Sequence, residues 1–63
     1  MTKDELQIDY FNKMQIWMRE EQNTRTVVFE HRGEDLAAQE AIEEKAHQAY
    51  VEARRAFAMA PKD

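Results

Sequence analysis

The sequence predicts an all-α protein: a two-helix antiparallel hairpin, with helices over about 3–31 and 35–60, that dimerises into a four-helix bundle or a larger helical assembly. Three observations lead to this prediction. Apolar and small residues recur in steps of three and four along both halves of the chain. Gly33, the only glycine, separates the two halves. With 63 residues and no cysteine, a lone hairpin has neither a large core nor disulfides to stabilise it.

The first predicted helix begins with a capping box, in which Thr2 and Glu5 each accept a hydrogen bond from the other's backbone N–H. Bulky residues follow at the spacing of an amphipathic helix: Leu6, Tyr10, Met14 and Trp17, with Phe11 and Met18 widening the stripe. Ile8 and Ile16 project off this stripe. Either a second chain covers them, or they are ordinary isolated apolar residues on the surface.

Residues 22–32 allow two interpretations. Their β-branched composition is typical of a short strand, which would need to pair with its own copy across a dimer axis. If the first helix instead continues to His31, Gly33 would serve as its left-handed cap. We favour the helix, with an irregular turn near Asn23 as a variant.

The second predicted helix is rich in alanine and ends before Pro61. Its small residues form a heptad-like seam that a partner helix can approach closely: Ile42, Ala46, Ala49, Ala53, Ala56 and Ala60. Tyr50 and Phe57 flank this seam and supply most of its buried area. The large residues Trp17, Met14 and Tyr10 of the first helix are expected to lie against the alanines.

Length, charge and the lengths of apolar runs indicate the number of domains, the kinds of ligand and the compartment that we expect. We expect one domain over residues 1–63, without a flexible linker. The net charge of −4 argues against nucleic acid and anionic lipid as ligands. No apolar run is long enough to span a bilayer and the start has no signal-peptide core, so we expect a cytoplasmic protein without a membrane partner.

A short pattern in the second helix matches a known type of metal ligand pair. Glu44 and His47 have the Glu-x-x-His spacing of di-iron carboxylate bundles. The run from Glu43 to His47, with an aromatic residue three positions later, resembles the second helix of the small two-helix encapsulated ferritins. The resemblance implies a metal site across a subunit interface, with Glu21 as the glutamate from the first helix. A solvated helical face is the commoner origin of such a pair, so we predict no metal and keep this site as an alternative.

A second alternative involves arginine. Arg19, Arg25 and Arg32 step along one flank of a continuous first helix, where they could bind RNA, DNA or an anionic small molecule. No aromatic residues interleave with them, although such residues are typical of single-stranded nucleic-acid sites. Nucleic acid therefore stays an alternative partner.

The sequence contains no Ser-His-Asp or Cys-His arrangement and no glycine-rich phosphate loop, so we expect neither an enzyme nor a cofactor. The predicted function is to bind and modulate another macromolecule as a homo-oligomer, as small regulatory, accessory or phage-type inhibitor proteins do. Its expected partners are itself and another protein. Ile8, Ile16 and Val27 are apolar residues that we expect a lone hairpin to leave exposed. The predicted interface residues are Ile8, Tyr10, Ile16, Trp17, Val27, Tyr50 and Phe57.

Overall fold

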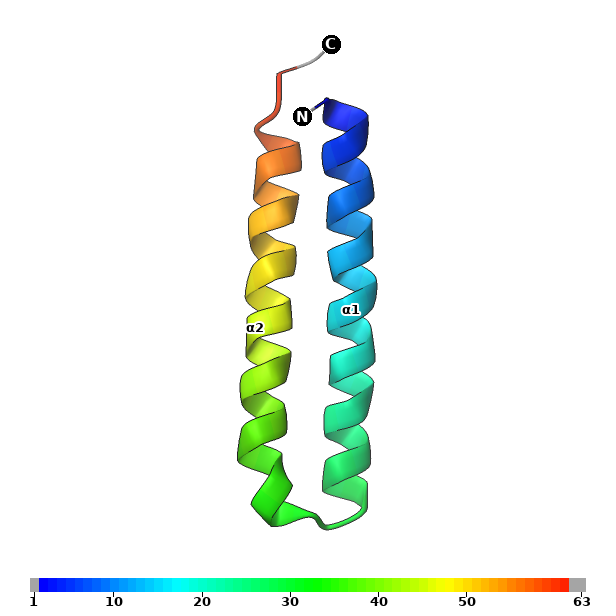
Figure 1. Cartoon of the computed structure of the whole chain (residues 1–63), viewed down its shortest axis with the longest axis vertical. Helices are drawn as coiled ribbons and strands as arrows, with labels where there is room; N and C mark the ends of the chain where they lie inside the picture. Colours follow the sequence, from blue (N-terminus) through cyan, green and yellow to red (C-terminus); the bar gives the residue numbers. More distant parts are fainter. Residues whose placement is uncertain (1, 62–63) are drawn as a thin grey trace.

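A computed structural model describes residues 2–61 and confirms the all-α hairpin. Helix α1 spans Lys3–Phe29 and helix α2 spans Gly33–Ala58. The two helices run antiparallel, with the turn at one end of the molecule and the start of α1 beside the end of α2 at the other (Figure 1). The molecule measures 49 × 13 × 12 Å. Residues 1, 62 and 63 of the expected domain lie outside the described residues.

Helix α1 begins with the predicted capping box. The hydroxyl of Thr2 accepts a hydrogen bond from the Glu5 backbone N–H at 3.2 Å, and the Thr2 backbone N–H donates to Oε1 of Glu5 at 3.2 Å. These bonds favour the carboxylate form, so the backbone hydrogen bond from Thr2, followed by its side-chain bond, lowers the pKa of Glu5. Asp4 and Glu5 also place negative charge at the positive end of the helix.

Helix α1 continues without a break through the ambiguous segment and ends at Phe29, two residues before the predicted end. The helical interpretation of residues 22–29 is therefore confirmed, and the irregular turn near Asn23 is absent. The hydroxyls of Thr24 and Thr26 donate to backbone carbonyls one turn earlier, at 3.0 and 3.1 Å. These bonds satisfy the threonine side chains within the helix, which offsets their preference for strands.

The turn corrects the predicted role of Gly33. The left-handed residue is His31, with φ 57°, whereas the described glycine has no positive φ and begins α2. The N–H of Arg32 donates to the carbonyl of Val27 and the N–H of His31 donates to that of Val28, both at 3.1 Å. This pair of bonds is a Schellman motif. Because α1 ends at Phe29, its left-handed cap position falls on His31 and not on Gly33.

Helix α2 is displaced toward the N-terminus relative to the predicted span 35–60. No side chain caps its first turn, but Glu34 and Asp35 complement the positive helix end. The helix ends at Ala58, before Pro61.

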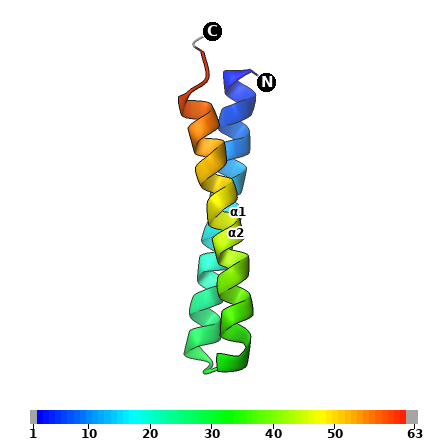
Figure 2. The same ribbon diagram turned by 90° about the vertical axis from the view of Figure 1, so that its left-hand side faces the viewer.

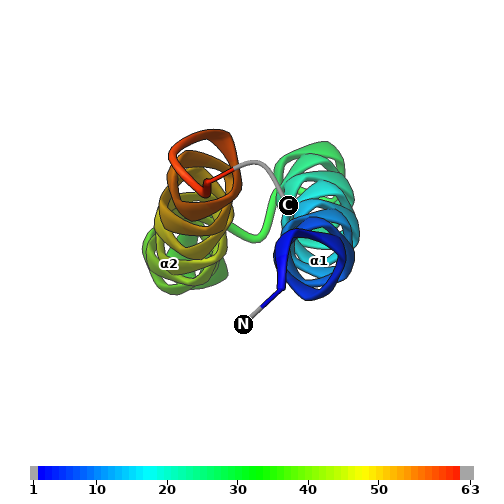
Figure 3. The ribbon, with the colours of Figure 1, turned by 90° about the horizontal axis from the view of Figure 1, so that it is seen from above.

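The two helices run alongside each other over their length (Figures 2 and 3). Two heptad rows of residues, one from each half of the chain, form the contact between them, and we call these rows the inner seam. All of its members are buried or half-buried. From α1 these are Lys3, Leu6, Tyr10, Lys13, Trp17, Glu20, Thr24 and Val27. From α2 and the residues that follow it they are Leu36, Gln39, Glu43, Ala46, Tyr50, Ala53, Phe57 and Ala60. The predicted alanine seam was therefore partly wrong, because Ile42 and Ala56 are exposed whereas Tyr50 and Phe57 lie within the seam.

A continuous stack of rings occupies the part of the inner seam nearest the termini. We call it the ring stack; its members, in order, are Phe57, Tyr10, Tyr50, Trp17 and His47. Successive ring centroids are 5.6, 5.8, 5.2 and 4.6 Å apart, within the range of favourable aromatic pairs. The rings alternate between the two helices, so the stack holds them together over several turns.

Toward the turn, the inner seam becomes polar. The side-chain amide of Gln39 donates to the backbone carbonyl of Glu20 at 3.2 Å and thereby bridges the helices. Beyond this bridge, Val27 is 4% exposed, and Ala53, on the ring-stack side, is 6% exposed. Among the described residues, only these two fall into the fully buried class. The hairpin therefore has a thin core, which the half-buried rings largely supply.

The ring stack predicts a large cost for removing its central ring. Trp17→Ala should lower the free energy of unfolding by about 2–3 kcal/mol, somewhat less than for a fully buried tryptophan. Glu52→Ala, at an exposed position of α2, is the control and should change it by less than about 0.5 kcal/mol. Both changes in the free energy of unfolding can be measured by thermal unfolding, followed by circular dichroism at a fixed protein concentration. Equal effects of the two variants would contradict the importance of the stack.

The conformation of the turn predicts that Gly33→Ala stabilises the protein. Gly33 has no positive φ, and a Cβ at this position meets no atom within 4 Å. Alanine should therefore raise the free energy of unfolding by about 0.4–1 kcal/mol, by restricting the unfolded chain. His31→Gly should also stabilise the fold, because His31 carries the left-handed strain. Destabilisation by Gly33→Ala would show that glycine is required there.

Candidate functional site

The structure divides the predicted interface residues into two groups. Tyr10, Trp17, Tyr50 and Phe57 contact one another in the ring stack, within a single chain. The large apolar residues Ile8 and Ile16 are exposed, as expected for a lone hairpin. The expectation that Val27 would also be exposed was wrong. Val27 is buried because the helix end places it in the inner seam, near Leu36.

Several large apolar side chains that the sequence reasoning assigned no interface role are also exposed. With the two isoleucines they form this set: Ile8, Phe11, Ile16, Met18, Val28, Phe29, Ile42 and Met59. Phe29 is 84% exposed, Ile8 60% and Met18 57%. So many large exposed apolar residues on a chain of 63 are typical of a protein that binds a partner.

Four of these side chains lie on one row of α1, which we call the outer line. It consists of Asp4, Ile8, Phe11, Gln15, Met18, Gln22, Arg25 and Phe29, and all of its members are exposed. The steps between them are three or four residues, as in a coiled-coil seam. Helix α1 thus carries two heptad rows, one facing α2 and one facing outward. A search for a second row in the first helix would have found this surface from the sequence.

Charged residues lie on the outer line and beside it. Within the described residues Arg19 forms no ion pair, whereas Arg25 pairs with Glu21 at 2.7 Å. Near the other end of the line, Glu5 uses Oε1 for both hydrogen bonds with Thr2. The outer line therefore has an acidic group at its N-terminal end and a free basic group beyond its middle.

The structure places the alternative metal ligands in separate local interactions. The imidazole of His47 packs on Trp17, with ring centroids 4.6 Å apart. Glu44 accepts a hydrogen bond from Gln48 at 2.9 Å, and Glu21 accepts one from Arg25. Within residues 2–61, no three carboxylate or imidazole groups are grouped so that they could hold a metal ion.

The arginines are not brought together. Arg19 and Arg25 are six residues apart on α1, which places them on different sides of a helix with 3.6 residues per turn. Arg32 lies in the turn, where it contacts Glu30 at 3.5 Å and Asp35 at 3.7 Å. These neighbouring carboxylates reduce its attraction for an anion.

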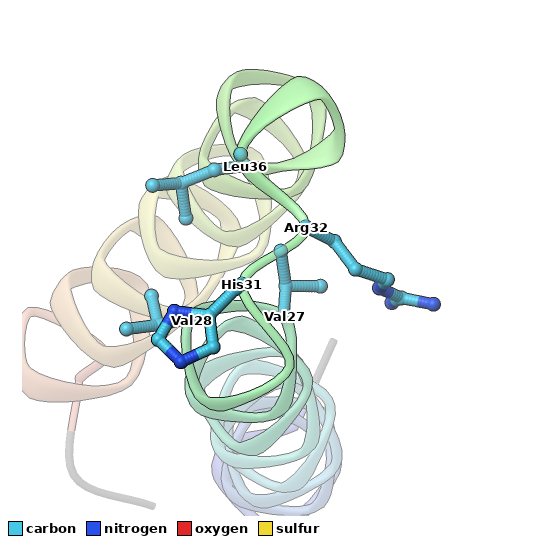
Figure 4. A pocket seen from close by; sticks show the side chains of 6 residues that line it. Val27, Val28, His31, Arg32 and Leu36 are labelled. Carbon is cyan, nitrogen blue, oxygen red and sulfur yellow. The ribbon is translucent and has the colours of Figure 1, made fainter.

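A hollow of about 250 Å³ lies at the turn, lined by Val27, Val28, His31, Arg32, Gly33 and Leu36. Figure 4 shows the Arg32 side chain directed away from the imidazole of His31 and from Leu36. The two basic groups therefore do not converge on a ligand. A second hollow, of about 370 Å³, adjoins Phe29 on α1 and belongs to the exposed surface of the outer line.

Comparisons of the chain with protein-family models, with curated proteins and with solved structures find no match. In the described part of the chain, neither helix has an apolar stretch that would cross a bilayer. The outer line is therefore the candidate site that the geometry itself supplies.

The packing of His47 predicts that an aromatic ring can replace it. His47→Phe should keep the unfolding temperature close to that of the wild type, because phenylalanine can maintain the contact with Trp17 and Tyr50. His47→Ala should lower it. Added zinc should shift neither variant nor the wild type, as measured by thermal unfolding with and without the metal. A zinc-dependent rise that His47→Phe abolishes would instead establish a metal site between subunits.

Proposed function

We propose that this chain is a non-catalytic helical protein that forms a homo-oligomer and binds and modulates another macromolecule. The observation that supports this proposal best is the row of large apolar side chains on the outer face of α1. Burying these side chains would provide stabilisation that the thin inner seam does not. Self-association is the first role of this surface.

The exposed apolar residues are numerous enough for more than one contact. Ile42 lies in α2 and Met59 is the residue that follows the end of α2, so both lie outside the outer line of α1. If the outer line is used for self-association, these side chains stay accessible on the assembled protein. We propose that a second macromolecule, most simply another protein, binds the hairpin around Ile42.

The alternatives have less support from the contacts. A metal bound by Glu21, Glu44 and His47 would first have to break their local interactions within the chain. An anionic ligand or nucleic acid would meet a net charge of −4 and arginines on different sides of α1. Protein binding requires no such rearrangement.

The two parts of the proposal predict separate results. Light scattering coupled to size-exclusion chromatography should give a molar mass at least twice the 7.5 kDa of one chain. Ile42→Glu should keep that mass but weaken capture of a protein partner in affinity purification. Ala41→Glu, which adds the same charge at the neighbouring exposed position, is the matched control and should capture the partner normally.

A monomeric mass at micromolar concentration would contradict the homo-oligomer. Equal capture by both glutamate variants would contradict the role of Ile42. These outcomes are independent, because the first concerns the mass of the protein alone and the second concerns its complex.

A further inference from the structure

The exposed surface of the hairpin is large for its mass. The accessible area is 4970 Å². A compact monomer of 7.5 kDa would expose about 4,200 Å². The excess of about 770 Å² is close to the area of roughly 800 Å² that each partner contributes to a standard protein interface. One interface of ordinary size on each hairpin would therefore remove the excess.

The outer line of α1 has the pattern of such an interface. Ile8, Phe11 and Met18 lie on it within three turns, separated by Gln15. A parallel, in-register pair of α1 helices would place Arg25 against its own copy, which like-charge repulsion disfavours. An antiparallel pair avoids this contact and is the arrangement that a two-fold axis gives to two facing helices.

Side-chain chemistry selects one antiparallel register. With the two-fold axis near Lys13, Ile8 lies opposite Met18 of the partner subunit, and Phe11 lies opposite Gln15 of the partner subunit. Shifting the pairing by one heptad toward the turn would instead place the apolar Ile8 opposite the charged Arg25 of the partner subunit. Shifting the pairing by one heptad away from the turn would leave Met18 without a helical residue of the partner subunit opposite it.

The same register brings opposite charges together. Glu5 and Arg19 flank the outer line on the same side, where equivalent rows of two antiparallel helices meet. Each Glu5 then lies beside Arg19 of the partner subunit, so the contact forms twice. Within the described residues, Oε2 of Glu5 accepts no hydrogen bond, because Thr2 engages Oε1 alone. The hydrogen bonds from Thr2 also keep the pKa of Glu5 low, so the carboxylate is charged.

We infer that α1 packs antiparallel against α1 of a second copy of this chain through the outer line from Asp4 to Gln22, with Glu5 of each subunit against Arg19 of the other. This inference rests on the proposed homo-oligomer and specifies its interface. The resulting dimer contains four helices, with the two α1 helices in the centre. Phe29 and the turn lie beyond the overlap at each end, so they stay accessible to another partner.

A charge exchange tests the pairing. Arg19→Glu places like charges in both contacts and should raise the dimer dissociation constant about tenfold or more. Glu5→Arg should also raise the dimer dissociation constant, and it should in addition destabilise the start of α1 because the capping box is lost. An equimolar mixture of the two variants restores opposite charges at both contacts and should form a heterodimer with near wild-type affinity, measured by analytical ultracentrifugation. A mixture that associates no better than either variant would overturn the pairing.

Distances between spin labels test the register. The chain has no cysteine, so Asn12→Cys and Thr26→Cys each provide one labelling site on the same flank of α1. At a rise of 1.5 Å per residue, the labels of a dimer should be separated along the axis by about 3 Å at position 12 and by about 39 Å at position 26. Equal distances at both positions would indicate a parallel pair and overturn the inference while leaving the homo-oligomer intact. A protein without any dimer signal would contradict both.

Discussion

The ring stack between the two helices is the interaction on which the rest of the structure depends. Tyr10 and Trp17 of α1 alternate with Phe57, Tyr50 and His47 of α2, and successive centroids lie within 6 Å. Elsewhere the inner seam is mixed. Its lysine, glutamate, threonine and glutamine side chains add little apolar area, and its largest apolar members outside the stack are Leu6, Val27 and Leu36. The stack therefore fixes which faces of the helices meet and, by consequence, which face of α1 points outward.

The stack leaves the hairpin incomplete as an isolated unit. A two-helix structure has no third element to cover its outer faces, and here those faces carry isoleucine, methionine and phenylalanine side chains. Small domains without disulfides or a structural metal commonly obtain the missing stabilisation from oligomerisation. Association through the outer line would bury these side chains without disturbing the ring stack. Fold and function are coupled in this proposal, because the surface that we propose for binding is also the surface that the fold leaves uncovered.

Much of the fold could be predicted from the sequence, because local signals determine it. The capping box of Thr2 and Glu5, the two helices and the helical character of residues 22–29 all follow from spacing and helix chemistry. The position of the turn did not follow, since a left-handed histidine is uncommon and glycine is the usual residue there. The facing side of α2 was also misjudged. Small residues occur on several sides of that helix, and only the partner rings decide which of them are buried.

The candidate site was predicted less completely than the fold. The aromatic residues expected at an interface between chains are used within one chain, and Val27 is buried by the helix end. Phe11 and Met18 were predicted to widen the bulky stripe, although both are exposed and belong to the second heptad row. The most direct test of the account is the unfolding temperature as a function of protein concentration. The temperature should rise with concentration, because the proposed association would stabilise the folded chain and not the unfolded chain. An unfolding temperature that does not change over a hundredfold range of concentration would show that the hairpin is stable alone and would contradict the account.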